Sequence, residues 1–285
     1  MSGLAPVLRD ATAALDAVSA TPRLDAELLL AHALGIERSE MLLRQHSLIA
    51  PDSFAALITR RIAHEPVAYI TGTQAFWDLE LRVTPDVLVP RADSETLLEA
   101  AIAYFGPDRS PTRIADLGTG SGALLLAALS IFPAAEGIGI DASVPAVAVA
   151  RENTERLGFA DRASTEIRDW TLPGWREGLG KFDLILCNPP YIEDDVVLAP
   201  MVSAYEPHTA LFAGDDGLDD YRILIPQLPN LLNPHGVALF EIGYNQAESV
   251  GLLAAEAGFV TELRHDLAGN PRVLRFSLGI EVYND

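Results

Sequence analysis

The 285-residue sequence has little of what marks exported or membrane-bound chains. It has one cysteine, Cys187, so no internal disulfide can form, and this count is typical of a reducing compartment. No apolar run reaches the roughly 20 residues that span a bilayer. Asp10 and Asp16 also argue against an N-terminal transit peptide. We therefore expect a soluble, cytoplasmic chain that has no contact with a membrane.

Metal-binding spacings and basic clusters are also scarce. The six histidines are scattered, and none stands at metal-ligand spacing from another or from the cysteine, so we expect no metal site. Basic residues number 20 against 40 acidic ones, which gives a formal net charge of −20. Because a duplex is bound through clustered Lys and Arg, we expect no stable nucleic-acid partner. A basic protein partner suits this charge better.

The first 65 residues or so carry helical patterns. Helices are expected over 24–36, with an apolar stripe of Leu24, Leu28 and Ala31, and over 52–64. Residues 76–83 alternate and are rich in strand formers, which predicts a hairpin closed by residues 87–91. We predict a helical domain over 1–73, a hairpin linker over 74–92 and a larger domain over 93–285. The helical domain is either a cover for the larger domain or a docking module for a macromolecular substrate.

From residue 112 onward, strand and helix patterns alternate, which predicts an α/β domain. Such alternation produces a mostly parallel sheet with helices on both faces, and ligands bind at the carboxyl ends of its strands. The expected strands lie near 114–116, 137–141, 165–167, 184–187, 237–242, 260–263 and 273–276, and the expected helices over 94–105, 122–131, 144–157, 218–232 and 246–257.

The motif Asn188-Pro189-Pro190-Tyr191 follows an apolar run that we expect to be a strand buried on both faces. Each proline fixes φ at about −65° and has no N–H, so the backbone carbonyls here are held in place and free to accept. Asn188 adds a side-chain carbonyl, and Tyr191 adds a flat ring with a polar tip. The motif therefore predicts a slot for a planar group that carries an NH2. A plain proline turn after a strand is the ordinary structural alternative.

A glycine-rich loop, Gly118-Thr119-Gly120-Ser121-Gly122, joins the first strand of the sheet to its helix. Glycines permit positive φ and let a ligand approach the backbone closely. The loop also satisfies the dinucleotide fingerprint, with an acidic residue about 20 positions further on. By itself, the loop does not separate a nicotinamide dinucleotide from another nucleoside ligand.

Two features favour S-adenosylmethionine over a dinucleotide. Asp116, just ahead of the glycines, suits the ammonium group of an amino acid better than a pyrophosphate. The motif at 188–191 has no evident part in hydride transfer. We expect the amino-acid end of the ligand over the loop and its ribose hydroxyls at Asp141. Asp169 offers a carboxylate to the adenine amine, and Trp170 offers a ring to its face, although this pair also suits an ordinary loop.

These residues occur in a sequence that resembles the HemK/PrmC protein-(glutamine-N5) methyltransferases, which modify the Gly-Gly-Gln glutamine of peptide chain release factors. The Asn-Pro-Pro-Tyr motif is shared with enzymes that methylate amino groups of DNA and RNA. Its combination with residues 61–95 is much more specific. Ser94 stands where the family usually has Thr and keeps the hydroxyl. The resemblance covers nearly the whole chain and includes 61–72, 76, 87–95, 116–122, 188–191, 206–207, 210–211, 217–218, 241–243, 246, 269 and 272.

The resemblance implies a class I (Rossmann-like) S-adenosylmethionine-dependent methyltransferase sheet with a small N-terminal helical domain. It implies donor contacts from residues 118–122, Asp141 and Trp170, and a substrate amide held by residues 188–191, with Asn188 touching both. The product is S-adenosylhomocysteine, and no metal or dedicated strong base is expected. Release factors are the implied partners of a chain that we expect to be monomeric.

Four alternatives remain open from the sequence. Two keep the fold and change the substrate to a ribosomal-protein glutamine or to the exocyclic amine of a flipped-out base. The third is an NAD-dependent oxidoreductase, and the fourth is a non-catalytic scaffold that binds the donor. The acidic charge counts against the base, and the intact slot at 188–191 counts against the scaffold.

Overall fold

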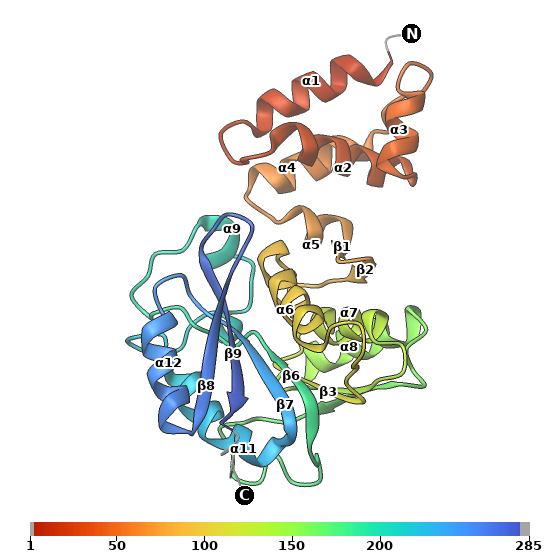
Figure 1. The fold of residues 1–285 in the computed structure, drawn as a ribbon. Coiled ribbons are helices and arrows are strands. Elements are labelled where there is room, and N and C mark those ends of the chain that lie inside the picture. The colour runs from red at the N-terminus through yellow and green to blue at the C-terminus, as the bar shows by residue number, and fades with distance from the viewer. Residues whose placement is uncertain (1–2, 280–285) are drawn as a thin grey trace, which may run out of the picture. The chain divides into compact units, whose positions relative to one another are not determined.

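The computed structural model describes residues 3–279, which form two compact units (Figure 1). The helical unit comprises residues 1–73 and 198–206, and the sheet unit comprises residues 74–197 and 207–285. The segment 198–206, which the sequence analysis assigned to the larger domain, therefore groups with the helices. Within the helical unit, Tyr205 donates a hydrogen bond from its hydroxyl to the carbonyl of Ala63 at 2.9 Å. The helices of this unit are α1 (Leu4–Leu15), α2 (Pro22–Leu34), α3 (Arg38–Arg44), α4 (Ser53–Ile62), α5 (Val67–Thr71) and α9 (Pro200–Ser203).

The buried face of α2 differs from the predicted one. Ala31 of the predicted stripe is buried, but Leu24 and Leu28 are 39% and 37% exposed. Leu29 and Leu30 are fully buried instead. The leucines of α2 lie on several sides of the helix, so its sequence pattern was compatible with more than one buried face. The inner face also carries Asp25, which receives a hydrogen bond at 2.8 Å from the guanidinium of Arg61 on α4. Burying this pair is tolerable because each charge is neutralised by its partner.

The sheet unit contains a seven-stranded sheet in the order β5-β4-β3-β6-β7-β9-β8. The first five of these strands run parallel, while β9 is antiparallel to both β7 and β8. The predicted α/β class with a mostly parallel sheet is confirmed. A separate hairpin pairs β1 (Thr73–Phe76) with β2 (Leu79–Arg82). The sheet strands are β3 (Arg113–Leu117), β4 (Glu136–Asp141), β5 (Ala163–Ile167), β6 (Phe182–Cys187), β7 (Leu232–Glu241), β8 (Phe259–His265) and β9 (Pro271–Leu278).

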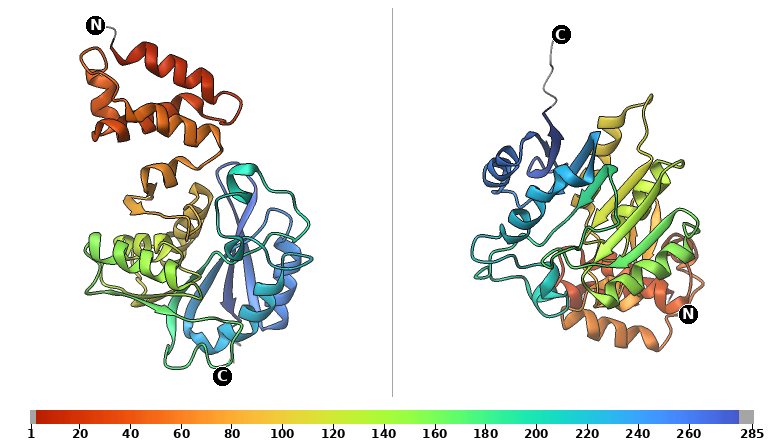
Figure 2. Two further views of the ribbon diagram at one scale, coloured as in Figure 1. Left: turned by 180° about the vertical axis from the view of Figure 1, so that it is seen from behind. Right: turned by 90° about the horizontal axis from the view of Figure 1, so that it is seen from below.

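Helices cover both faces of this sheet (Figure 1, Figure 2). Alternate residues of each strand point to opposite faces, so each central strand feeds both layers of the core. On β6, Leu184 and Leu186 pack with α6 and α7, while Ile185 and Cys187 pack with α10, α11 and α12. The predicted burial of this strand on both faces is confirmed. The helices are η1 (Ala92–Ser94), α6 (Glu95–Phe105), α7 (Ala123–Ile131), α8 (Val144–Arg156), η2 (His208–Ala210), α10 (Asp219–Leu224), η3 (Ile225–Gln227), α11 (Leu228–Leu231) and α12 (Ala247–Glu256).

Two predicted elements differ from the structure, and proline explains both. The helix expected over 218–232 is divided into α10, η3 and α11, because Pro226 and Pro229 lack the N–H that a continuous helix needs. Residues 87–91 form no strand and do not extend the hairpin. Pro85 and Pro90 interrupt this segment, and Val87 donates its N–H to Thr84 in a turn. The segment lines a cavity of the sheet unit instead.

Candidate active site

The carboxyl ends of β3, β4 and β6 bring predicted site residues close together. Leu117, the last residue of β3, pairs with Ile140 on β4 and with Cys187 on β6. Asp141 and Asn188 come directly after those partners, so both lie beside the loop that follows β3. The chain continues from β3 to β4 on one side and reaches β6 on the other, which is the switch point where open α/β sheets bind ligands.

The glycine-rich loop has a backbone that only glycine adopts without strain. Gly118, Gly120 and Gly122 have φ of +78°, +53° and +84°. A Cβ on Gly118 would also lie 3.2 Å from the ring of Trp170. Asn153 on α8 is fully buried and donates to the carbonyl of Ser121 at 2.9 Å. The sequence analysis missed Asn153, because only the packing of α8 brings it to the loop.

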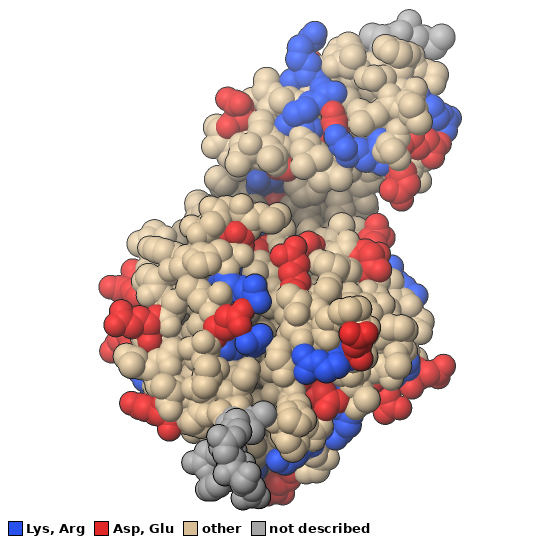
Figure 3. Space-filling view, in the orientation of Figure 1, with Lys and Arg blue, Asp and Glu red and all other residues tan. Residues whose placement is uncertain are grey.

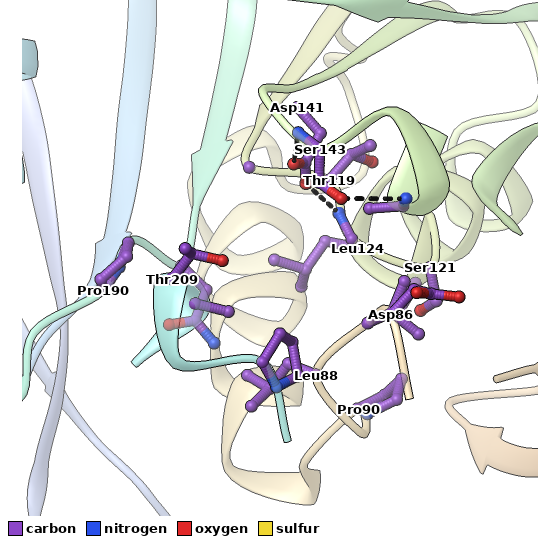
Figure 4. Close-up of a pocket in the computed structure, with 18 of the residues that line it drawn as sticks. Asp86, Leu88, Pro90, Thr119, Ser121, Leu124, Asp141, Ser143, Pro190 and Thr209 are labelled. Atoms are coloured by element: carbon purple, nitrogen blue, oxygen red, sulfur yellow. Dashed lines mark hydrogen bonds between the residues drawn. The ribbon is translucent and has the colours of Figure 1, made fainter. Parts of the chain in front are cut away.

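Asp141 is fixed by the backbone on both sides of its carboxylate. Its oxygens accept from the N–H groups of Gly120 and Ser143, each at 2.9 Å. Burial raises the pKa of Asp141, while these two hydrogen bonds favour the ionised form. Ser143 also caps α8 by accepting from the N–H of Ala146 at 3.2 Å. Figure 4 shows Asp141, Ser143 and Thr119 gathered at one side of the cavity.

The Asn188–Tyr191 motif is held from both ends by a buried carboxylate. The side-chain NH2 of Asn188 donates to Ser94 Oγ at 3.2 Å, and Ser94 donates to Glu241 Oε2 at 2.5 Å. Tyr191 donates its hydroxyl to Glu241 Oε1 at 3.3 Å, and burial raises the pKa of this tyrosine. The sequence analysis gave Ser94 and Glu241 no role. They lie 147 positions apart in the chain, so no local spacing connects them.

These elements surround one cavity of about 430 Å³ (Figure 4). Eight of the predicted residues line it: Gly118, Thr119, Gly120, Ser121, Asp141, Trp170, Asn188 and Pro190. The segments 86–91 and 207–210 complete the wall, and sequence reasoning had assigned neither to the site. Predicted residues that do not line the cavity are Asp116, Gly122, Asp169, Pro189 and Tyr191, and their assignments stay predictions.

Asp116 lies beneath the glycine loop and is only 1% exposed. Its Oδ2 accepts from Thr119 Oγ1 at 2.7 Å, and its Oδ1 has no hydrogen-bond partner among the described residues. Burial raises the pKa of Asp116 to about 7. A buried carboxylate with an unused oxygen beside the loop is chemically suited to a cationic ligand group.

The raised pKa of Asp116 predicts a pH-dependent loss of stability. The folded protein keeps this proton up to a pH of about 7, whereas in the unfolded chain the carboxyl has its ordinary pKa of 3.8 and releases the proton near that pH. Stability therefore falls as the pH rises between these values, by about 2–3 kcal/mol from pH 5 to pH 8. Asp116→Asn should remove that loss, because Asn has no proton to release. Denaturant unfolding of both proteins at the two pH values measures it, and an equal pH dependence in both would contradict it.

Asp169 and Trp170 have different local partners. Asp169 Oδ1 accepts from both the N–H and the hydroxyl of Thr171, at 2.9 and 2.6 Å. The indole N–H of Trp170 donates to Asp220 Oδ1 at 2.6 Å, which fixes the ring beside Gly118. Burial raises the pKa of Asp220. Thus Asp220, rather than Asp169, positions the aromatic wall of the cavity.

The charge distribution of the sheet unit shows basic side chains paired with acidic neighbours. Arg264 and Arg275 both form ion pairs with Glu262 at 2.6 Å. The face of the molecule in Figure 3 shows Lys and Arg interspersed with Asp and Glu over this unit. Among residues 3–279, no cluster of three metal-ligating side chains is found. Nor does any helix in that range have both the length and the hydrophobicity of a transmembrane span.

Two families of protein domains and several known enzymes are similar in sequence to this chain. Residues 6–72 match the model of the PrmC N-terminal domain, and residues 108–257 match that of a methyltransferase domain. The chain is 44% identical to the release factor glutamine methyltransferase of Rhodospirillum rubrum, over 89% of this chain and 78% of the relative. For the enzyme of the same name from Caulobacter vibrioides, the identity is 41%, over 89% and 88%.

A solved methyltransferase structure from Pyrococcus furiosus shares the fold, with a TM-score of 0.51 and 19% identity over 79% of this chain and 98% of that chain. The predicted class I methyltransferase fold and the predicted family resemblance are both confirmed. The length and level of the sequence identity show that this chain belongs to the release factor glutamine methyltransferase family.

Proposed function

We propose that this chain transfers a methyl group from S-adenosylmethionine to the side-chain amide nitrogen of the glutamine in the Gly-Gly-Gln motif of peptide chain release factors. One observation supports the proposal: the glycine-rich loop and the motif at 188–191 follow adjacent strands and line the same cavity. An enzyme that methylates an amide needs both reactants side by side in this way. The relatives named above carry the corresponding activity in their names.

The residues present suit the methyl donor. Gly120 opens into free space with a positive φ, so a ligand is able to approach its backbone. Asp141 keeps lone pairs for ribose hydroxyls after accepting its two backbone N–H groups. The unused oxygen of Asp116 suits an ammonium group, and the ring of Trp170 suits an adenine face. When bound there, S-adenosylmethionine supplies an electrophilic methyl group on a positively charged sulfur.

The motif at 188–191 prepares the amide of the substrate. An amide nitrogen is a poor nucleophile, because its lone pair is delocalised into the carbonyl. Hydrogen bonds from its NH2 to Asn188 Oδ1 and to the Pro189 carbonyl hold the nitrogen in line and return electron density to it. Such placement alone supplies about 7–11 kcal/mol of a barrier in favourable cases. As the nitrogen lone pair forms the new N–C bond, the S–CH3 bond would break with its electron pair kept on sulfur, and S-adenosylhomocysteine would leave. The alkylated nitrogen, now strongly acidic, would then release its proton to water.

The test is transfer of label to a single glutamine. Incubation with methyl-labelled S-adenosylmethionine and an unmethylated release factor should label only the glutamine of the Gly-Gly-Gln motif, as mapped by mass spectrometry. A release factor with that glutamine replaced by alanine is the matched control and should stay unlabelled. A labelled control, or an unlabelled wild-type substrate, would contradict the proposal.

The same assay distinguishes the alternatives. Label on a ribosomal-protein glutamine or on RNA, with none on the release factor, would keep the chemistry and change the substrate. Calorimetric titration with NADH and with S-adenosylmethionine separates the oxidoreductase, because only the donor that the cavity fits should bind. Binding of the donor without transfer to any of these substrates would favour the scaffold.

A further inference from the structure

The orientation of the Asn188 side chain is set by hydrogen bonds that lead to a buried carboxylate. Glu241 is 2% exposed and Ser94 is 4% exposed, so water does not compete for their hydrogen bonds. The register of the sheet creates this contact. Cys187 on β6 pairs with Phe240 on β7, so Asn188 and Glu241 each stand one residue further along neighbouring strands. Ser94, at the end of η1, lies between their side chains.

The chemistry of these three groups gives the chain of hydrogen bonds a direction. An ionised carboxylate only accepts, so the hydroxyl of Ser94 must donate to Glu241. The oxygen of Ser94 is then left to accept, and it accepts from the NH2 of Asn188. The NH2 end of the amide is therefore turned to Ser94, and Oδ1 is the end that remains for a ligand. An amide whose N and O ends look alike in shape is assigned by its partners in this way.

Three neighbours of Glu241 support its ionised form against the effect of burial. Burial raises the pKa of Glu241, and Asp93 acts in the same direction. Hydrogen bonds from Ser94 and Tyr191 and the nearby charge of Arg272 oppose this rise. Arg272 itself forms ion pairs with Asp266 at 3.1 Å and with Asp93 at 3.3 Å. Glu241 thus accepts a hydrogen bond on each of its oxygens, one from Ser94 and one from Tyr191.

We propose that Ser94 and Glu241 are positioning residues for methyl transfer, which present Asn188 Oδ1, and not its NH2, to the amide nitrogen of the substrate. With the opposite orientation, two NH2 groups would face each other and the substrate nitrogen would lose an acceptor. The hydroxyl of Tyr191 binds the second oxygen of Glu241, so one carboxylate aligns both ends of the motif. This inference rests on the proposed function, because it assigns the amide as the group that Asn188 receives.

Kinetics provide the first test, with variants that separate orientation from folding. Ser94→Ala should lower the single-turnover rate at least about tenfold, the effect of one lost hydrogen bond to a site group, and leave donor affinity unchanged. Ser94→Thr keeps the hydroxyl and should stay within about threefold of wild type. Glu241→Gln keeps the shape but replaces one of the two acceptor oxygens with an NH2, so either Ser94 or Tyr191 loses its acceptor and transfer should also slow. Thermal unfolding of each variant shows whether the fold is kept.

A double-mutant cycle identifies the residue through which Ser94 acts. If Ser94 acts through Asn188, Ser94→Ala should have almost no further effect on transfer in an Asn188→Ala background. A full additional loss in that background would overturn the inference, and so would a Ser94→Ala rate within twofold of wild type.

An NMR measurement tests the orientation without any release factor. In protein labelled with 15N-asparagine, the side-chain NH2 signals of Asn188 are assigned by their absence in Asn188→Ala. They should shift in Ser94→Ala and Glu241→Gln and stay nearly unchanged in Ser94→Thr. Unchanged signals in all variants would overturn the inference. Shifted signals together with an inactive wild-type enzyme would instead contradict the proposed function alone.

Discussion

Asn188→Ala is expected to slow methyl transfer by about 100- to 1,000-fold, the usual effect of removing one preorganised polar group from a reacting centre. The variant loses the Oδ1 acceptor for the substrate amide, while the glycine loop and Asp141 are untouched. Donor affinity should therefore change little. Single-turnover labelling measures the rate, and calorimetric titration with S-adenosylmethionine measures donor binding.

Asn233→Ala provides a matched control for this variant. Asn233 lies near the amino end of β7, away from the carboxyl ends of the strands that form the site. It donates to Asp183 Oδ1 at 2.7 Å. Its replacement removes the same side chain from the same unit without touching the cavity, so the transfer rate should stay near wild type. A near wild-type rate in Asn188→Ala would refute the amide slot. Equal loss of rate and of donor affinity would indicate that Asn188 serves binding alone.

Gly217→Ala is expected to disturb the Asn188–Tyr191 motif, because Gly217 lies against the backbone of Tyr191. Gly217 has φ of +67°, and a Cβ there would lie 2.4 Å from the backbone oxygen of Tyr191 and 2.8 Å from Gln246 Nε2. Gln246 stabilises the motif by donating from Nε2 to the backbone oxygen of Tyr191 at 3.0 Å. Backbone strain of about 1–2 kcal/mol adds to overpacking of about 1–3 kcal/mol, so we expect a stability loss of about 2–5 kcal/mol. The transfer rate should also fall more than about tenfold, because a displaced Tyr191 carries the motif with it.

The control for this prediction is Gly258→Ala. Gly258 belongs to the same unit and has φ of +84°, but a Cβ there would meet nothing within 4 Å. This variant bears the backbone strain without the clash, so it should lose only about 1–2 kcal/mol and keep its activity. Denaturant unfolding and single-turnover rates at a temperature where both variants are folded measure the difference. Equal losses would show that the contact with Tyr191 is unimportant.

Local sequence patterns determined the fold class and the two main pieces of the site. The alternation of strands and helices after residue 112 predicted a mostly parallel sheet, and the structure has one. The glycine loop and the motif at 188–191 each contain their chemistry within a few consecutive residues. Each also follows a strand directly, so the rule that ligands bind at strand ends was enough to bring them together.

Packing decided what local patterns left open. The leucines of α2 surround the helix, and the buried Asp25–Arg61 pair selected which of them face inward. Residues 87–91 have strand-forming side chains, but Pro85 precedes the segment and Pro90 lies within it, and most of the segment lines the cavity. In each case the local pattern was compatible with more than one structure, and only the folded chain shows which one forms.

The sequence alone therefore determined which groups we propose for the chemistry, because the loop, the carboxylate and the amide occur in short motifs at strand ends. Only the tertiary structure decided how those groups are oriented. Asn153 supports Ser121, Asp220 positions Trp170, and Glu241 directs Asn188 through Ser94. These partners come from other elements of the chain, up to 94 positions from the residue that they orient. A hydrogen bond depends on where the folded backbone places two side chains, and no spacing in the sequence records that distance.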